Sequence, residues 1–234
     1  MKFFVDAAIF EKFPGALVGV IVAKNINNAG ESDELLELLR GEEKRIVSTL
    51  TAEQLPVLPK VDCWRKAYSA FGAKPKEHRS SVENLHRLVL KGAELRHVNK
   101  LVDMYNYVSL KHMLPVGGED LDKMQGDLRL TFASASEPAV LLLGEKEERP
   151  PHAGEVIYRD DVGIVCRRWN WREADRTKLT EETKNTILVI EALPPTIASE
   201  LQAAVSELKQ LVEQHCSGQI MYKVLEANDR EISF

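Results

Sequence analysis

Two polar residues, Asp103 and Asn106, lie on one face of a helical stretch that runs into a Pro/Gly segment at 114–122. That segment contains Gly117 and Gly118. A polar helix face leading into such a loop can present side-chain amides and free backbone N–H groups to a ligand oxygen. The alternative is structural, because Asp103 and Asn106 could instead tie down the loop through side-chain to backbone hydrogen bonds.

The segment 166–175 concentrates cations and aromatic rings, with three arginines and two tryptophans in six positions. Arginines pair with phosphates and stack on bases, and exposed tryptophans provide stacking surfaces for unpaired nucleotides. Arg168, Trp169, Trp171 and Arg172 are therefore candidate RNA contacts. In the alternative interpretation the tryptophans cover the core and the arginines form ion pairs with the acidic residues that follow.

Glu191 interrupts an apolar run, 186–192, that reads as a buried strand. A carboxylate buried alone is costly, so Glu191 must be either paired or functional. A Thr183-x-Asn185 element precedes the run.

Other catalytic and metal-binding patterns are absent from the sequence. It has no glycine-rich dinucleotide or phosphate loop, no H-E-x-x-H and no G-x-S-x-G. Cys166 alternates with Arg167 along a predicted strand, which favours core packing of the thiol over a nucleophilic role. His86 and His97 lack a suitably spaced carboxylate or cysteine, so we expect no metal site, and nothing indicates a cofactor.

Charge is distributed unevenly along the 234 residues, which carry a net charge of -5. Residues 60–100 contain 10 basic and 4 acidic side chains, a local excess of +6. This segment, which includes Lys74, Lys76 and Arg79, could face a polyanion such as RNA. The alternative is an ordinary solvated helical surface.

Composition points to a globular protein, with 44% hydrophobic and 29% charged residues. The longest apolar run, 15–23, is about half of the roughly 20 residues needed to span a bilayer, so we expect no membrane partner. The N-terminus shows no secretory pattern, and the 3 cysteines are unclustered. These features predict a cytoplasmic protein.

Hydrophobic periodicity predicts helices mainly in the first half of the chain. The N-terminal part contains two short strands, and Ser80 begins a capping box at the start of one helix. A helix beginning after Ser32 is expected to stop at Gly41, with another short helix after it. The predicted strands are 2–5 and 16–22, and the predicted helices are 33–40, 42–50, 62–71, 81–90 and 98–108.

After Pro115 the periodicity changes to that of strands, followed by one helix and a final strand. Helices first and strands later favour an α+β fold with a layered mixed sheet over a doubly wound sheet. No repeat or linker divides the chain, which predicts a single domain over 1–234. The predicted strands are 128–132, 139–143, 155–158, 162–167, 186–192 and 220–225, and the helix is 196–215.

Several of these segments, in this order, resemble the B3/B4 tRNA-binding domain of the phenylalanyl-tRNA synthetase beta subunit in a free-standing form. The resemblance runs from about Phe13 to Ala192. It is carried by Trp64-Arg65-x-x-Tyr68-x-x-Phe71-Gly72, Asn106-Tyr107-Val108-Ser109, 115–122, Gly154-Glu155-Val156 and Thr183-x-Asn185.

The resemblance implies a layered mixed fold and an editing activity, in which the ester of a wrongly attached amino acid is hydrolysed at the tRNA 3′ end. Gly117 stands where the family has a histidine, so no editing histidine is expected there. Glu191 is the nearest counterpart of a pocket glutamate, about two residues further along. The residues from Arg168 to Arg172 replace a glycine-rich turn of the family.

On this basis we predict a trans-acting editing factor whose partner is aminoacylated tRNA, with a synthetase as a further partner. Glu191 would read the ammonium or side chain of the amino acid, and Gly117 and Gly118 would allow close backbone approach. Asn106 would orient that loop. Arg168 and Arg172 would hold phosphate or the terminal adenosine.

Two alternatives remain open at this point. The first is a module that binds the tRNA 3′ end without catalysis. The second is an amino-acid or small-molecule binding protein, or an enzyme, that reuses the pocket without nucleic acid. The net negative charge is compatible with the second alternative.

Overall fold

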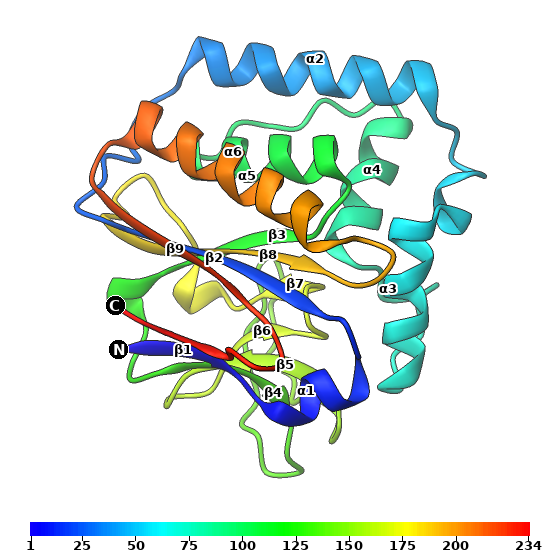
Figure 1. Cartoon of the computed structure of the whole chain (residues 1–234), viewed down its shortest axis with the longest axis vertical. Helices are drawn as coiled ribbons and strands as arrows, with labels where there is room; N and C mark the ends of the chain where they lie inside the picture. The colour runs from blue at the N-terminus through cyan, green and yellow to red at the C-terminus, as the bar shows by residue number, and fades with distance from the viewer.

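The computed structural model describes all residues, 1–234, as helices stacked on two sheets (Figure 1). A four-stranded sheet lies in the middle, with helices on one of its faces and a six-stranded sheet on the other. The helices are α1 (Ala7–Lys12), α2 (Asp33–Thr49), α3 (Pro59–Ala70), α4 (Ser81–Leu90), α5 (Lys100–His112) and α6 (Ala198–Cys216).

The strands of the four-stranded sheet follow the order β3-β8-β2-β9, and every pair is antiparallel. The six-stranded sheet has the order β10-β1-β4-β5-β6-β7 and is mixed, because β1 and β4 are parallel. The α+β fold with a layered mixed sheet is thus confirmed. The strands are β1 (Lys2–Val5), β2 (Leu17–Lys24), β3 (Val116–Asp120), β4 (Leu128–Phe132), β5 (Val156–Arg159), β6 (Ile164–Arg167), β7 (Arg172–Glu173), β8 (Asn185–Ala192), β9 (Gln219–Leu225) and β10 (Glu231–Ser233).

The side chains of strand β2 alternate between two apolar cores, one on each face of the four-stranded sheet. Val20 and Val22 point toward the six-stranded sheet and join one apolar cluster. Ile21 and Ala23 point toward the helices and join the other. Because successive side chains of a strand face opposite sides, an apolar run such as β2 is suited to burial on both faces.

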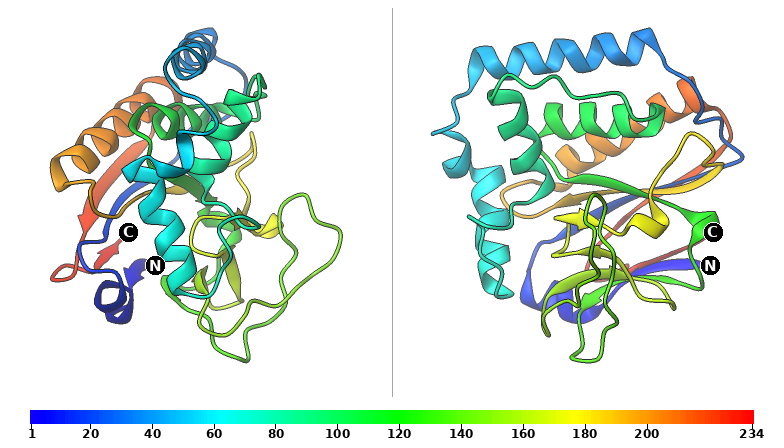
Figure 2. Two further views of the ribbon diagram at one scale, coloured as in Figure 1. Left: turned by 90° about the vertical axis from the view of Figure 1, so that its right-hand side faces the viewer. Right: turned by 180° about the vertical axis from the view of Figure 1, so that it is seen from behind.

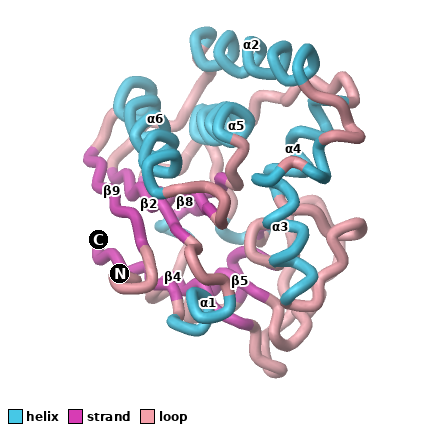
Figure 3. Tube along the Cα trace, turned by 45° about the vertical axis from the view of Figure 1, so that its right-hand side comes forward, coloured by secondary structure: helices cyan, strands magenta, loops and turns pink.

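Helices α5 and α6 cover the outer face of the four-stranded sheet, and α2 packs on α5 as the outermost helix. Helices α3 and α4 run down one side of the sheets (Figure 3). Pairing of β1 with β10 places the two termini side by side (Figure 1). None of the helices combines the length and apolar character needed to cross a bilayer.

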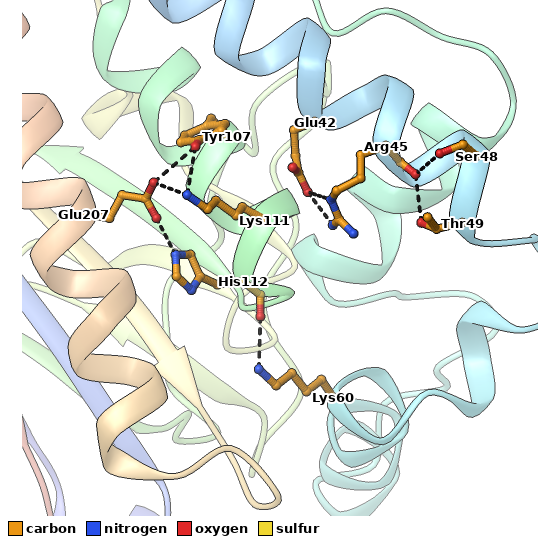
Figure 4. A network of polar contacts seen from close by, with 9 residues as sticks. All are labelled: Glu42, Arg45, Ser48, Thr49, Lys60, Tyr107, Lys111, His112 and Glu207. Carbon is orange, nitrogen blue, oxygen red and sulfur yellow. Dashed lines mark hydrogen bonds and ion pairs between the residues drawn. The ribbon is translucent and has the colours of Figure 1, made fainter.

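A charged network joins α5 to α6 on the helical side of the molecule (Figure 4). The carboxylate of Glu207 accepts hydrogen bonds from Tyr107 at 3.1 Å, Lys111 at 2.6 Å and His112 at 2.6 Å. Burial alone would raise the pKa of Glu207, but the hydrogen bonds and charges of His112 and Lys111 hold it at about 2. The network therefore fixes the packing of the two helices outside the sheet interior.

Several predicted elements match the structure at their boundaries, including β1, α4 and β4. The predicted break at Gly41 is wrong, because α2 continues through it to Thr49. A glycine costs a helix only about 1 kcal/mol relative to alanine, and packing of α2 on α5 outweighs that cost. The predicted strand at 139–143 is also wrong, since only isolated bridges form at Val140 and Leu142.

The segment between β4 and β5, residues 133–155, leaves the sheet and projects as a long loop (Figure 2). Two features hold it to the body of the protein. Leu142 bridges to Ala174, and the Glu145 carboxylate accepts a hydrogen bond from Arg172 at 2.8 Å. The loop thereby brings Leu143 to the rim of the cavity described next.

Candidate binding cavity

A cavity of about 200 Å³ lies between the two sheets. Its walls come from β3 and β8 of one sheet and from β4, β5, β6 and β7 of the other. The turn between β6 and β7 and the first residue of α4 complete it. The lining is mostly apolar, and three glutamates, Glu119, Glu173 and Glu191, project into it.

Glu191 is buried, with only 2% of its surface exposed, and both carboxylate oxygens are engaged. The Tyr158 hydroxyl donates to Oε1 at 2.6 Å, and the Asn170 amide donates to Oε2 at 2.6 Å. The Tyr68 hydroxyl in turn donates to the side-chain amide oxygen of Asn170, Oδ1, at 2.8 Å. Burial raises the pKa of Glu191 to about 7, although hydrogen bonds from Tyr158 and Asn170 oppose the shift. Glu191 is therefore held in one orientation and titrates near neutral pH.

Glu119 and Glu173 form a second acidic group in the same cavity. Burial, then the charge of Glu173, raises the pKa of Glu119 well above its ordinary value. Burial raises the pKa of Glu173 to about 7, while the backbone N–H of Gly118 opposes this shift. Glu119 is buried and Glu173 is half-buried, and two interacting carboxyls in such a setting cannot both ionise cheaply, so the pair retains a proton at neutral pH.

Two potential nucleophiles also line the cavity. Burial, followed by the charges of Glu173 and Glu119, raises the pKa of the Cys166 thiol well above its ordinary value. Cys166 belongs to the apolar core, as the sequence indicated, and a thiolate is disfavoured there. The Ser81 hydroxyl is buried without a hydrogen-bond partner. No histidine lines the cavity to activate it as a nucleophile.

The turn between β6 and β7 carries two consecutive residues with left-handed backbone. The φ angles of Arg168 and Trp169 are 48° and 65°, values that favour glycine. The Arg168 N–H donates to Glu155 at 3.1 Å and the Trp169 N–H donates to Val156 at 2.6 Å. These bonds hold a conformation that is strained for bulky residues, and Asn170 follows directly, aimed at Glu191.

The expectation that Trp169 is an exposed stacking surface is wrong. Its side chain is 1% exposed and packs between Phe13 and Trp64, with ring centroids 4.8 Å and 5.0 Å away. Trp171 is only partly buried and lines the cavity. The guanidinium groups of Arg168 and Arg172 lie 4.4 Å and 4.8 Å from the Trp171 ring, within cation–π range.

The two arginines differ in accessibility. Arg168 is buried and lies 3.7 Å from Glu155, which also pairs with Arg167 at 2.8 Å. The side chain of Arg172 is 40% exposed and donates to Glu145 at the cavity rim. Arg172 and Trp171 therefore remain accessible as ligand contacts, whereas Arg168 serves mainly to hold the turn.

Gly117 and Gly118 lie in strand β3, not in the loop that the sequence predicted. The Glu191 N–H donates to the backbone carbonyl of Pro115 at 3.0 Å, which sets the alternation of backbone groups along β3. The N–H and C=O of Gly117 therefore point toward β8, and the N–H of Gly118 points to the free edge of the sheet. A Cβ on Gly117 would lie 3.1 Å from Glu173 Oε1, and one on Gly118 would lie 2.4 Å from Leu188. Gly117 thus adjoins the cavity, and Gly118 allows close packing on the other face.

Asn106 lies on α5, does not line the cavity and makes no side-chain hydrogen bond. Its predicted role in orienting the loop is not supported. Ser109 performs the tethering instead, because its hydroxyl donates to Leu114 at 2.7 Å. Asp103 ties down the preceding segment by accepting from His97 at 2.5 Å.

The Thr183-x-Asn185 element contacts the end of the Pro/Gly segment. The Thr183 hydroxyl donates to Asp120 at 2.8 Å, and the Asn185 amide donates to Asp122 at 2.9 Å. These bonds fix β3 against β8 in the register that the cavity requires. The element is therefore structural.

Part of the basic segment 60–100 is used internally. Arg65 and Arg87 pair with the fully buried Glu83 at 2.8 Å and 2.9 Å, and Arg79 lies 3.8 Å from it. Lys74 is 75% exposed and pairs with Glu77. Lys76, which is exposed, and Lys74 line a shallow hollow at the loop between α3 and α4.

A second hollow connects this surface to the cavity wall. Lys74, His78 and Arg168 line it, and the His78 ring lies 4.8 Å from the ring of Trp171. Trp171 itself lines the main cavity. The exposed cations and the cavity are thus neighbours across a single aromatic side chain.

Sequence reasoning missed four residues of the cavity: Glu119, Tyr158, Asn170 and Glu173. Glu119 and Glu173 lie beside the glycines of segment 114–122 and the arginines of segment 166–175. Strand alternation could not single out Tyr158, because three consecutive residues of β5, 156–158, are buried. No sequence pattern predicts the role of Asn170, because the direction of its side chain is set by an irregular turn.

Comparison with known proteins identifies relatives among phenylalanine–tRNA ligase beta subunits. A family model described as the B3/4 domain matches residues 63–227, a span that begins and ends later than the expected 13–192. The phenylalanine–tRNA ligase beta subunit of Leifsonia xyli is 36% identical over 76 residues, 32% of this chain and 9% of that protein. That of Bordetella pertussis is 33% identical over 99 residues, 42% of this chain and 12% of that protein.

The chain spans only a small part of these curated relatives. Among solved structures, an N-terminal fragment of the phenylalanyl-tRNA synthetase beta subunit from Pyrococcus horikoshii matches with a TM-score of 0.47 and 11% identity, covering 96% of this chain and 54% of the fragment. The family model covers more than half of the 234 residues. The chain belongs to the B3/4 domain family.

Proposed function

We propose that this B3/4 protein acts in trans on aminoacyl-tRNA and hydrolyses the ester of a wrongly attached amino acid. The family relationship to the beta subunit of a tRNA ligase supports the tRNA association. The observation that carries the proposal is Glu191, a buried carboxyl fixed by Tyr158 and Asn170 inside a cavity large enough for an amino acid.

Glu191 is suited to recognising a hydrogen-bond donor on the aminoacyl group. Each carboxylate oxygen accepts one hydrogen bond from the protein and retains further acceptor capacity. A ligand ammonium or hydroxyl would therefore complete the carboxylate's bonding. Such a preorganised contact holds the ester in one position, which lowers the entropic cost of attack by water.

The proposed reaction consumes one water. Its oxygen bonds to the ester carbonyl carbon, and the bond from that carbon to the ribose oxygen breaks. The ribose oxygen leaves as a hydroxyl by taking up a proton, and the amino acid departs as the free acid. The Gly118 N–H at the free edge of β3 is directed at the Glu173 carboxyl, so it is not free to polarise the ester carbonyl.

The nucleic acid would approach the face that carries Lys74, Lys76 and His78. Trp171 separates this surface from the cavity, and Arg172 lies at the rim. Cations of this kind attract phosphates, and Trp171 offers an aromatic face to a base. A synthetase partner would add further contacts to the tRNA body.

The test is a deacylation screen with purified protein and tRNAs that each carry a wrong amino acid. We expect selective ester loss for one or a few pairs, at rates well above spontaneous hydrolysis. Glu191→Ala should remove this activity or broaden its selectivity, because the fixed carboxyl is lost. Glu213→Gln is the matched control, since Glu213 lies on α6 with its side chain 47% exposed.

Two results would contradict the proposal. One is ester loss no faster than in buffer for every tRNA, which would leave a non-catalytic module. The other is full activity and selectivity in Glu191→Ala, which would remove Glu191 from the site.

Two observations favour a second candidate, a protein that binds free amino acids. The cavity is rich in carboxyls and the net charge is -5, both of which disfavour a polyanion. This candidate predicts no tRNA binding even at low salt. A titration with uncharged tRNA at two salt concentrations separates the two functions.

A further inference from the structure

The cavity contains three carboxyls and no cation of its own that is free to neutralise them. Glu119, Glu173 and Glu191 all line it, whereas the single basic residue in its wall is Arg172. Arg172 is engaged at the rim, where it donates to Glu145 at 2.8 Å and lies over Trp171. Its charge is therefore directed away from the interior.

Glu119 is the clearest sign of a missing ligand group. The residue is only 7% exposed, and its Oε2 is buried without a hydrogen-bond partner. The Thr177 hydroxyl, itself buried without a partner, is a neutral donor that lowers the pKa of Glu119 but supplies no charge. An unpaired buried carboxyl oxygen costs free energy that a folded protein normally avoids. A donor that enters the cavity would satisfy it.

Neighbouring charges do not satisfy this acidic pair. The charge of Arg176 lowers the pKa of Glu119, but its guanidinium donates to both carboxylate oxygens of Asp160, at 2.7 Å and 2.9 Å. The other titratable groups that face the pair, the Tyr105 hydroxyl and the Cys166 thiol, are neutral because burial raises the pKa of both.

The acidic pair and Glu191 lie at different ends of the cavity. Glu119 is opposite Ile187 on β8, and Glu191 is four residues further along that strand. At about 3.3 Å per residue, this separates the two positions by roughly 13 Å along the sheet. A single ligand that reached both ends would need two donor groups with an apolar chain between them.

We propose that the Glu119–Glu173 pair binds a second cationic group of the ligand, so that the cavity selects an amino acid with a basic side chain. One ammonium would bind Glu191 and the other cation would bind the pair. The apolar walls, which include Ile187 and Val189, would contact the methylene chain between them. The statement that this amino acid arrives as an ester on tRNA rests on the proposed function.

The size and electrostatics of the cavity agree with this assignment. A cavity of about 150 Å³ accommodates a benzene molecule, so about 200 Å³ accommodates a chain of amino-acid size. In the empty cavity a shared proton relieves the repulsion between the two carboxyls. A bound cation neutralises both carboxylates and displaces the shared proton.

Calorimetric titration with L-lysinamide and L-norleucinamide tests the proposal without tRNA. Both carry an α-ammonium and an unbranched side chain, and only L-lysinamide has a second cation. At pH 8 we expect L-lysinamide to bind at least tenfold more tightly than L-norleucinamide. At pH 6.5 we expect its binding to release a proton, so that the measured binding enthalpy depends on the ionisation enthalpy of the buffer. Glu119→Gln should abolish the preference, and Glu213→Gln should preserve it.

Glu173→Gln is a second variant, for the case that Glu119→Gln does not fold. Equal binding of the two amides, binding of neither, or an unchanged preference in the folded Glu119→Gln or Glu173→Gln protein would overturn the inference. Failure of the proposed function is distinguishable, because selective binding of L-lysinamide without deacylation of any tRNA would refute hydrolysis and leave the cation site standing.

Discussion

At the residue scale, the central feature is the chain of hydrogen bonds that holds Glu191. It runs from Tyr68 to Asn170 and from Asn170 to Glu191, which also accepts from Tyr158. Asn170 reaches this position because the two residues before it, Arg168 and Trp169, adopt left-handed backbone. The strain of the turn therefore serves to orient the amide that fixes the carboxyl.

The raised pKa of Glu191 makes a prediction about stability. Its pKa is about 7 in the folded protein and near 4.5 in the unfolded chain, so between these values the folded state binds a proton that the unfolded state lacks. This contribution to stability is complete below pH 4.5 and is lost as the pH rises to 7, by roughly 3 kcal/mol. Glu191→Gln has no such proton.

Urea unfolding at pH 5 and pH 8 measures the effect. We expect Glu191→Gln to become more stable relative to the native protein at pH 8 than at pH 5, by up to about 3 kcal/mol. The difference for Glu213→Gln should stay constant between the two pH values. Parallel profiles for Glu191→Gln and the native protein would show that the carboxyl is not buried as described.

Burial of Glu191 could be inferred from sequence, because it lies in the apolar run that became β8. The hydrogen-bond partners of Glu191 could not be inferred from the sequence. Asn170 lies in a turn whose backbone no local propensity predicts, and Tyr158 meets Glu191 only because the two sheets pack face to face. The roles expected of Trp169 and Asn106 failed for the same reason, since exposure and direction depend on tertiary packing.

At the element scale, strand β3 decides the shape of the cavity. Its sequence, VGGED, has low strand propensity and predicts a loop, but pairing with β8 overrides that preference. The two glycines of β3 face opposite sides of the sheet. Gly117 adjoins the Glu173 carboxyl, and Gly118 packs against Leu188.

This arrangement predicts opposite consequences for two similar substitutions. Gly117→Ala should place a methyl group 3.1 Å from the Glu173 carboxyl, narrow the cavity and weaken ligand binding at least tenfold, with little effect on unfolding. Gly118→Ala should force Leu188 to shift and destabilise the protein by about 1 to 3 kcal/mol.

Thermal unfolding and amide titration on the two variants, side by side, check the contrast. Each serves as the control for the other, because both add one methyl group to the same strand. Equal loss of stability in both would show that β3 tolerates neither position, and normal ligand binding in Gly117→Ala would place the ligand elsewhere.

At the scale of the whole molecule, the basic segment 60–100 divides into an internal and an external part. Glu83 takes up the charge of Arg65 and Arg87 and lies close to Arg79. The sequence showed the excess of +6, but it could not show which cations fold inward. Lys74 and Lys76 remain on the surface next to the cavity wall.

Charge reversal at Lys74 and Lys76 tests whether RNA binds this surface specifically or responds only to the net charge of the protein. We expect Lys74→Glu/Lys76→Glu to weaken tRNA binding several-fold and to reduce its dependence on salt concentration, because phosphate contacts release counterions. The control is Lys44→Glu/Lys184→Glu, which changes the net charge by the same amount at exposed positions on α2 and before β8. Equal losses in both double variants, measured by filter binding at two salt concentrations, would argue against a specific RNA surface.

The packing of Trp169 between Phe13 and Trp64, beside Trp171 in the cavity wall, gathers all three tryptophans of the chain at one place. No indole lies elsewhere in the molecule to contribute a constant background. The tryptophan emission of the protein is therefore a property of the cavity and its neighbourhood. Any ligand that displaces water there or changes the protonation of the nearby carboxyls alters that emission, so the protein carries its own optical reporter of occupancy.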